Sequence, residues 1–196
     1  GTISGFSTSV GEWRSMYYTT SMHYAFKGKY VFDLTTRVDA TTKFGPARRW
    51  GVFPALSLRW NISDENFMKK IPWISMLSIR PTWGIVGNQP GSEYLFFSKY
   101  SSTSSYNDNP SITPSNIRLS NLKWEQVEKW NIGFDYGLFE DKINGDVNIY
   151  YNNTTDLLMS NRSIPTSSGY SSLNSQNTGS MENKGFEFSL GADLVK

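Results

Sequence analysis

Apolar and polar residues alternate with a two-residue period along much of the chain. In the run 30–39, one face carries Tyr, Phe, Leu, Thr and Val, and the other carries Val, Asp, Thr, Arg and Asp. Successive side chains of a β-strand point to opposite faces, so this pattern predicts a strand with one apolar and one polar face. The same alternation recurs in the runs 130–139, 143–152 and 186–194.

Weaker alternation over about 15–26, 49–61 and 75–86 raises the expected total to about seven strands. Each predicted strand is about 10 to 16 residues long, whereas strands of water-soluble proteins average about 5 to 6 residues and a tilted strand needs about 9 to 11 to cross a bilayer. The sequence therefore predicts an all-β fold, namely part of a transmembrane antiparallel β-barrel.

The predicted connections alternate between short and long. Residues 27–29 and 140–142 are expected to form tight polar hairpins, and 61–72 a longer turn with one helical turn capped by Ser63. The other connections are long and polar, and two of them are rich in Ser, Asn, Thr, Gly and Pro; they cover residues 1–14, 40–48, 87–121 and 158–182. Short periplasmic turns and long extracellular loops are typical of bacterial outer-membrane barrels.

Aromatic residues lie near both ends of the predicted strands, as two membrane interfaces require. The set beside the short turns is Phe26, Tyr30, Trp60 and Phe139, and the set at the opposite ends is Trp50, Trp83 and Trp124.

Composition narrows the function classes. Charged residues make up 18% of the chain, the net charge is +2 and there is no cysteine, which argues against a nucleic-acid partner, a disulfide framework and a thiolate metal site. No run of about 18 apolar residues indicates a transmembrane helix. The mean hydropathy of −0.45 does not argue against a barrel, because alternating strands average to neutral values. The chain starts at Gly1 without a leader and ends at Lys196 within a strand-like run, so we expect an internal piece of a larger barrel.

Several runs resemble the barrel of the SusC/RagA family of TonB-dependent transporters of Bacteroidetes. The matching runs occur in family order and cover nearly the whole chain: KYVFDLTTRVDATTKFG (29–45), RWGVFPALSLRWNISDENFM (49–68), LSIRPTWGIVGNQ (77–89), LKWEQVEKWNIGFDYGLFEDKINGDVNIYYNNTTDLL (122–158) and ENKGFEFSL (182–190).

This resemblance implies a 22-stranded outer-membrane barrel, of which residues 1–196 would be an internal part that lacks the plug, the TonB box and the C-terminal strands. It also implies import of a bulky nutrient, an oligosaccharide or a peptide. The implied partners are a SusD-like surface lipoprotein, the TonB complex acting through the missing N-terminal region, and the lipid of the outer membrane.

The sequence offers little chemistry for catalysis, and no enzymatic activity or cofactor is expected. His23 is the single histidine, so no triad or histidine metal site can be completed. Glu140 and Asp141 are interpreted as solvated hairpin residues. The run 107–109, Asn-Asp-Asn, is a weak candidate for calcium in an extracellular loop.

Contact with substrate from the barrel interior and the outer loops is the remaining prediction. Aromatic rings stack on sugar faces, and charged groups bond to hydroxyls or peptide termini. The candidates are Arg37, Asp39, Arg59, Arg80, Tyr94, Phe96, Phe97, Tyr100 and Tyr106. The alternative is that the inward charges pair with one another or with the plug.

Two other functions stay open at this point. One is a soluble all-β carbohydrate-binding or adhesive module, which needs no detergent for purification. The other is a passive porin, which conducts ions steadily in liposomes, whereas a plugged importer is nearly closed.

Overall fold

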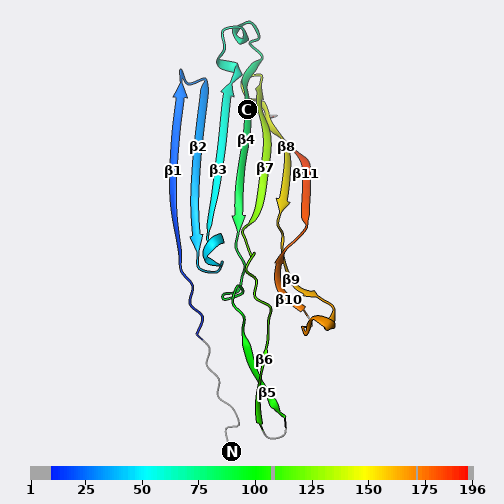
Figure 1. The fold of residues 1–196 in the computed structure, drawn as a ribbon. Helices are drawn as coiled ribbons and strands as arrows, with labels where there is room; N and C mark the ends of the chain where they lie inside the picture. The colour runs from blue at the N-terminus through cyan, green and yellow to red at the C-terminus, as the bar shows by residue number, and fades with distance from the viewer. Residues whose placement is uncertain (1–9, 107–108, 171, 194–196) are drawn as a thin grey trace, which may run out of the picture.

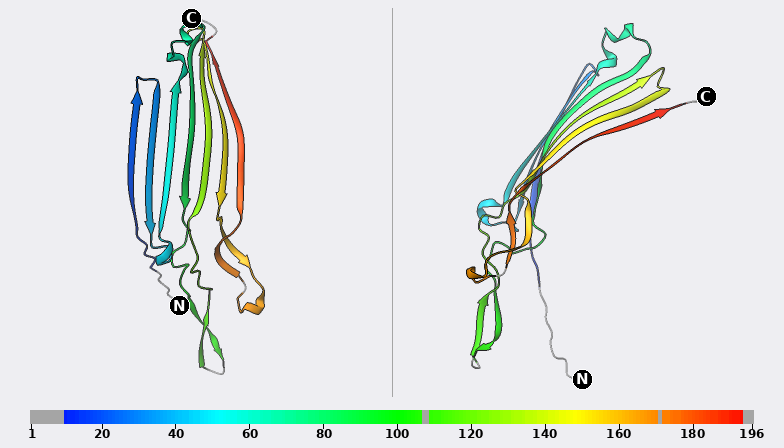
Figure 2. Two further views of the ribbon diagram at one scale, coloured as in Figure 1. Left: turned by 45° about the horizontal axis from the view of Figure 1, so that its top comes forward. Right: turned by 90° about the vertical axis from the view of Figure 1, so that its right-hand side faces the viewer.

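Seven long strands form one antiparallel sheet in a computed structural model, which describes residues 10–106, 109–170 and 172–193. The sheet order is β1-β2-β3-β4-β7-β8-β11 (Figure 1). Turned on its side, the sheet is a single layer with no second sheet packed on it (Figure 2). The seven predicted wall strands are thereby confirmed: β1 (Ser15–Phe26), β2 (Tyr30–Thr41), β3 (Trp50–Asn61), β4 (Ile74–Asn88), β7 (Glu125–Leu138), β8 (Ile143–Thr155) and β11 (Ser180–Ala192).

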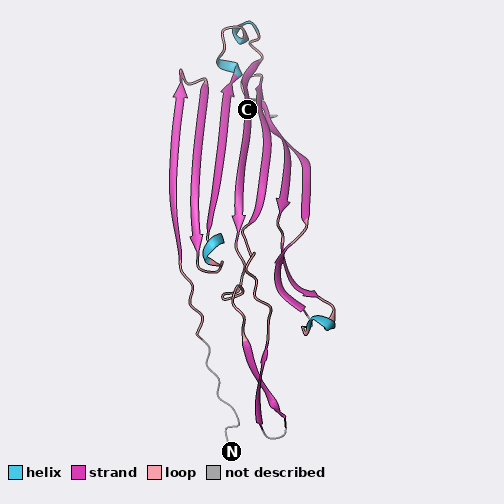
Figure 3. Cartoon of the chain, in the orientation of Figure 1, coloured by secondary structure: helices cyan, strands magenta, loops and turns pink. Residues whose placement is uncertain are grey.

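Two of the long loops contain strands that the sequence pattern did not predict. β5 (Tyr100–Tyr106) and β6 (Asn109–Pro114) form one hairpin, and β9 (Leu158–Ser163) and β10 (Ser172–Asn177) form another (Figure 3). We call these the β5–β6 arm and the β9–β10 arm. Short 3₁₀ helices complete the structure: η1 (Pro46–Arg48), η2 (Ile62–Asp64), η3 (Met68–Lys70) and η4 (Thr166–Ser168). Among the described residues, no helix is long and apolar enough to span a membrane.

The connections at one end of the sheet, the short-turn end, are compact. In the three-residue loop 27–29, Lys27 and Gly28 both have positive φ, 52° and 70°, and the Lys29 N–H closes the turn by donating to the Phe26 carbonyl at 3.1 Å. The three-residue run 139–141 is also left-handed. In the longer turn after β3, Ser63 lies inside η2, whose N-cap is Asn61, and no side chain caps this helix. The predicted Ser63 cap is therefore wrong, because η2 starts one residue before it.

Glu65 closes this longer turn onto the neighbouring hairpin. Its carboxylate accepts hydrogen bonds from the Tyr30 hydroxyl (2.6 Å), the Lys29 ammonium (3.0 Å) and the Trp60 indole (3.3 Å). These donors, Tyr30 first, lower the pKa of Glu65 to about 2, because each stabilises the ionised form. The turn is thus held to the ends of β2 and β3 by one charged side chain.

The strand register sorts side chains onto two faces, since residues opposite each other in an antiparallel pair point the same way. One row of direct partners runs Pro81, Ile132, Ile149, Phe186, and a parallel row runs Ile79, Phe134, Val147, Phe188. These side chains are apolar, yet Phe186 is 69% exposed and Ile149 53%. The face that carries them, here the outer face, is therefore apolar without any protein layer to cover it.

The apolar band on the outer face runs diagonally across the strands. On β2 and β3 it extends toward the long loops past Val38 and Val52 to the pair Ala40 and Trp50, whereas on β11 it stops at Phe186, beyond which lies Lys184. Through the ladder pairs this edge rises by about six residues from the level of Val38 and about eight from that of Ala40, or roughly 20 to 27 Å, over five strand spacings of about 4.8 Å. A slope of about 40 to 48° results, close to the tilt of about 35–45° found for barrel strands in membranes.

The core of the molecule lies at the long-loop end of the sheet. Phe44, Leu95, Leu122 and Trp124 pack there around Phe53, whose ring fills the space over two glycines, Gly51 and Gly87. Trp124 is only 8% exposed, and its indole N–H donates to the Arg49 carbonyl at 3.1 Å. Trp124 was predicted to belong to an interfacial girdle; it is instead part of this core.

Candidate functional site

The inner face of the sheet is polar, and several of its charged side chains bond to one another. Asp135 on β7 accepts two hydrogen bonds from Arg80 on β4, at 2.6 and 2.7 Å, and a third from the Ser78 hydroxyl at 2.7 Å. Arg59 on β3 approaches the same carboxylate at 4.0 Å. The predicted candidates Arg59 and Arg80 therefore lie at the same carboxylate. This arrangement agrees with the alternative that the inward-facing charges pair with one another.

A second group of inner-face charges lies on β1 and β2. The His23 ring lies 2.5 Å from the Asp33 carboxylate across the β1–β2 ladder. Arg37 donates through Nε to both carboxylate oxygens of Asp39, at 2.8 and 2.9 Å, and its guanidinium lies 4.7 Å from the centroid of the Tyr17 ring. Of these four residues, Arg37 and Asp39 lie nearest the long-loop end, where the sheet meets a cavity.

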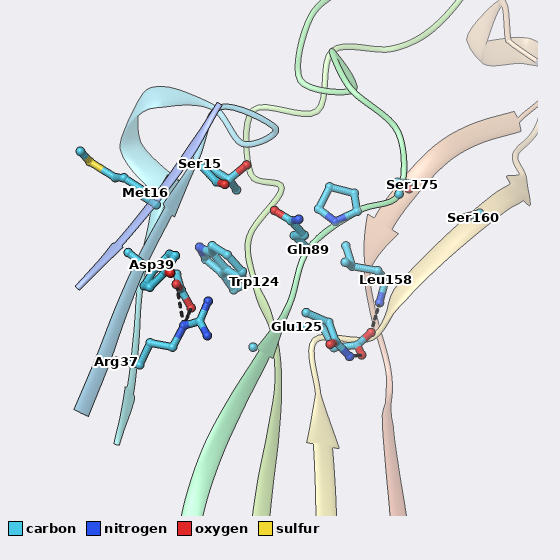
Figure 4. Close-up of a pocket in the computed structure, with 17 residues that line it drawn as sticks. Ser15, Met16, Arg37, Asp39, Gln89, Trp124, Glu125, Leu158, Ser160 and Ser175 are labelled. Atoms are coloured by element: carbon cyan, nitrogen blue, oxygen red, sulfur yellow. Dashed lines mark hydrogen bonds and ion pairs between the residues drawn. The ribbon is translucent and has the colours of Figure 1, made fainter. Parts of the chain in front are cut away.

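This cavity, which we call the mouth pocket, has a volume of about 570 Å³ (Figure 4). It lies between the ends of β1, β2 and β4 on one side and the β9–β10 arm on the other. Its lining combines polar groups with two aromatic residues: Ser15, Tyr17, Arg37, Asp39, Asn88, Gln89, Trp124, Glu125, Leu158, Ser160 and Ser175 are among the residues that form it. Such a lining suits a hydrated ligand with many hydrogen-bonding groups.

Glu125 and Lys43 fix two walls of the mouth pocket. Glu125 accepts a hydrogen bond from Asn88 Nδ2 at 2.8 Å and another from the Leu158 backbone N–H at 2.9 Å, so it ties β4 to the start of β9. Lys43 is 7% exposed, and its ammonium donates to the carbonyls of Pro90 and Gly91 at 3.1 and 3.2 Å. A buried ammonium needs such acceptors, so Lys43 holds the loop that follows β4 in place.

The predicted loop aromatics are spread over separate places. Tyr94 accepts the Glu12 backbone N–H at 2.8 Å; it borders a second cavity of about 330 Å³ together with Phe96, which is buried, and Phe97, which is 50% exposed. Tyr100 is exposed at the start of the β5–β6 arm. Tyr106 ends β5, and the structure does not describe its side chain.

Two of the nine candidates, Arg37 and Asp39, thus reach the mouth pocket. Sequence reasoning missed Tyr17, Gln89, Glu125, Ser160 and Ser175 as lining residues. Glu125 carried one usable signal, since it is an acid at the boundary between a polar loop and a strand. The serines carried none, because their loop is full of similar residues.

The calcium candidate 107–109 falls mostly outside the described residues. Within the described ranges, no three His, Cys, Asp or Glu side chains come together as metal ligands. The mouth pocket and the inner face hold ion pairs and hydroxyls, an arrangement that can bind and orient a polar solute by hydrogen bonds.

A single tilted sheet with an apolar outer face, a polar inner face, short turns at one end and long loops at the other defines a wall segment of an outer-membrane β-barrel. The family model for "TonB dependent receptor-like, beta-barrel" matches residues 6–195. The chain belongs to this family, and its location is the outer membrane.

Similar proteins extend the match. The chain is 36% identical over 185 residues to TonB-dependent receptor SusC of Bacteroides thetaiotaomicron, covering 91% of this chain and 18% of SusC. It is 36% identical over 173 residues to TonB-dependent receptor P39 of Formosa agariphila, covering 88% of this chain and 16% of that protein. The predicted resemblance to the SusC/RagA family is confirmed, and the chain spans about a fifth of the length of these relatives.

Solved structures agree on the fold. The RagAB peptide transporter matches with a TM-score of 0.83 at 24% identity, over 94% of this chain and 20% of that one. The RagAB peptide importer in its closed-closed state matches with a TM-score of 0.84 at 25% identity, over 95% of this chain and 20% of that one. Membership of this barrel family rules out the soluble carbohydrate-binding module.

Proposed function

We propose that this chain forms about a third of the wall of an active importer of bulky nutrients, since seven strands are about a third of a 22-stranded barrel. The observation that carries the proposal is the match of the whole sheet to TonB-dependent receptor barrels, together with a pocket at its long-loop end. Import is the activity that the name of the RagAB relative states for that protein.

The proposed substrate is an oligosaccharide or a peptide, the two solute classes with enough hydrogen-bonding groups for the mouth pocket. Arg37, Asp39, Gln89 and Glu125 would contact it there. Deeper along the wall, the pairs around Asp135 keep the inner face hydrated, so that a released solute moves along a polar surface.

The proposed partners are a SusD-like lipoprotein over the long loops and the TonB complex below the short turns. Binding under the lipoprotein, displacement of the plug by TonB and passage along the inner face form the proposed sequence of events. The segment takes part through binding and lining, with no bond made or broken in the solute.

The test uses the full-length transporter and its lipoprotein in cells. Labelled peptides from a tryptic digest of albumin and a labelled dextran hydrolysate are offered as probes, with and without functional TonB. Uptake of one probe that disappears when TonB is inactivated is the expected result. TonB-independent uptake, with steady ion conductance of the purified protein in liposomes, would instead establish the passive porin.

A further inference from the structure

The regular hydrogen-bond ladder of the wall is interrupted before the β9–β10 arm, where two irregular backbone bonds remain: Thr178 N–H donates to the Leu157 carbonyl at 2.9 Å, and Leu157 N–H donates to the Gly179 carbonyl at 3.4 Å. The β8–β11 ladder ends at the pair Thr155 and Ser180, and the arm's own ladder starts at Leu158 and Asn177. Between them, Asp156 and Gly179 adopt left-handed backbone conformations, with φ of 57° and 83°. Left-handed residues interrupt strand geometry, so the wall ladder alone does not fix the direction of the arm.

The Asn177 side chain adds bonds to residues outside the arm. The Asn177 carboxamide oxygen accepts the Lys123 backbone N–H at 2.8 Å, and its nitrogen donates to the Lys123 carbonyl at 2.8 Å and the Asp156 carbonyl at 2.9 Å. The two bonds to Lys123 reproduce the exchange of a strand pair. Asn177 thereby attaches the arm to the segment just before β7, 54 residues away in the sequence.

The other ties at this place are weaker or reach one strand only. Lys123 forms an ion pair with Asp156 at 2.7 Å, but both side chains are more than a third exposed, and such pairs contribute about 0 to 1 kcal/mol. Glu125 holds the Leu158 N–H, at the base of β9. For β10, the strand that carries the buried Ser175, the side-chain bonds of Asn177 connect its end to Lys123, in the segment before β7.

The arm supplies one wall of the mouth pocket through Leu158, Ser160 and Ser175. Ser175 also borders a cavity of about 440 Å³ that is lined by the arm on one side and by residues 118–123 on the other. With this empty space beneath it, the arm has room to shift relative to the pocket once its ties are removed.

We propose that Asn177 is a positioning residue that sets the width of the mouth pocket by docking the β9–β10 arm onto Lys123. The proposal rests on the proposed function, in that the pocket receives the imported solute. Asn177 contacts no solute itself and acts through Ser160 and Ser175.

The experiment measures pocket width in the purified full-length transporter. Nitroxide labels are attached through Ser15→Cys and Ser160→Cys, which lie on opposite sides of the pocket, and their distance distribution is recorded by pulsed electron paramagnetic resonance. Asn177→Ala and Asn177→Asp are compared with the wild type and with Asn183→Ala, which removes an exposed amide from β11. Asn177→Asp retains the size of the side chain and the oxygen that accepts from Lys123, and it removes the amide that donates to the carbonyls of Lys123 and Asp156.

The expected result is a clearly broader distance distribution for both Asn177 variants and an unchanged one for Asn183→Ala. Uptake by the Asn177 variants is expected to need about three- to tenfold more solute for half-saturation, as loss of one to two hydrogen bonds implies, with the maximal rate unchanged. Distributions that coincide for all four proteins, or an unchanged half-saturating concentration, overturn the proposal. A wild-type protein that imports neither probe refutes the proposed function alone, because the distance comparison does not depend on uptake.

Discussion

The two faces of the seven-stranded sheet alternate residue by residue but differ in how their side chains are satisfied. On the outer face, Ile132, Ile149 and Phe186 expose apolar surface. On the inner face, Arg80 donates two hydrogen bonds to the Asp135 carboxylate. The difference teaches that each face is matched to its own solvent: lipid accepts an apolar side chain without a protein partner, whereas charges over a water-filled interior still gain from pairing.

The largest expected effect comes from a charge placed on the outer face. Ile132→Arg puts a guanidinium in the middle of the apolar band, at a cost of about 2 to 4 kcal/mol at the bilayer midplane. The neighbouring Asn131→Arg is the control, since Asn131 points to the polar inner face. The measurement is guanidinium-induced unfolding of the full-length protein in phospholipid vesicles. Equal losses in the two variants would contradict the assignment of faces.

A smaller effect is expected from breaking the inner-face network. Asp135→Ala leaves Arg80 and Ser78 without their acceptor, and Arg80 is about a third exposed, so we expect a loss of about 1 to 3 kcal/mol. Unfolding of Asp135→Ala, Arg80→Ala and the double variant provides the coupling free energy. A coupling near zero would mean that water satisfies these groups as well as they satisfy each other.

The pair at the mouth pocket should matter less for stability. Arg37 is 53% exposed on its side chain, so replacing it by Gln is expected to change the unfolding free energy by less than about 1 kcal/mol. If Arg37 contacts solute, the same variant raises the half-saturating concentration in uptake assays several-fold. Thr35→Ser, on the same face of β2, serves as the control for uptake.

The smallest effect concerns pH at the short-turn end. Because the pKa of Glu65 falls from 4.5 to about 2 on folding, its contribution to stability is fully present above pH 4.5 and disappears as the pH falls toward 2. Glu65→Gln is therefore expected to unfold at a lower temperature than the wild type at pH 7, with the gap narrowing below pH 4.5. A gap that stays constant down to pH 2.5 would show that the Glu65 charge is unimportant.

The wall could be predicted from sequence because its two solvents impose a strict two-residue period. β2 was expected at 30–39 and ends at Thr41, and β8 was expected at 143–152 and ends at Thr155. β7 begins five residues before its expected start, at Glu125. Its first residues belong to the mouth, where the period is lost.

The arms and the mouth pocket could not be predicted, because long-range contacts determine them. β10 is built from Ser, Leu, Asn and Gln, without alternation, and its position depends on an amide bonded to Lys123. The inward direction of the Arg37 and Arg80 side chains could be predicted, because both residues occupy polar positions in the two-residue alternation of their strands. That Arg80 pairs with Asp135 depends on the register between β4 and β7, which no local pattern specifies.

The diagonal apolar band also acts as a safeguard against misassembly. A strand that slips by one residue exchanges its faces and places groups such as Asp135 in lipid. A slip by two residues keeps the faces but displaces the stacked Tyr30 and Trp60 rings by about 7 Å along the strand, away from the membrane surface. A one-residue shift in register is therefore unfavourable because it places charges in lipid. A two-residue shift is unfavourable because it moves aromatic rings of the protein away from the membrane surface. The bilayer thus selects the correct register in two ways.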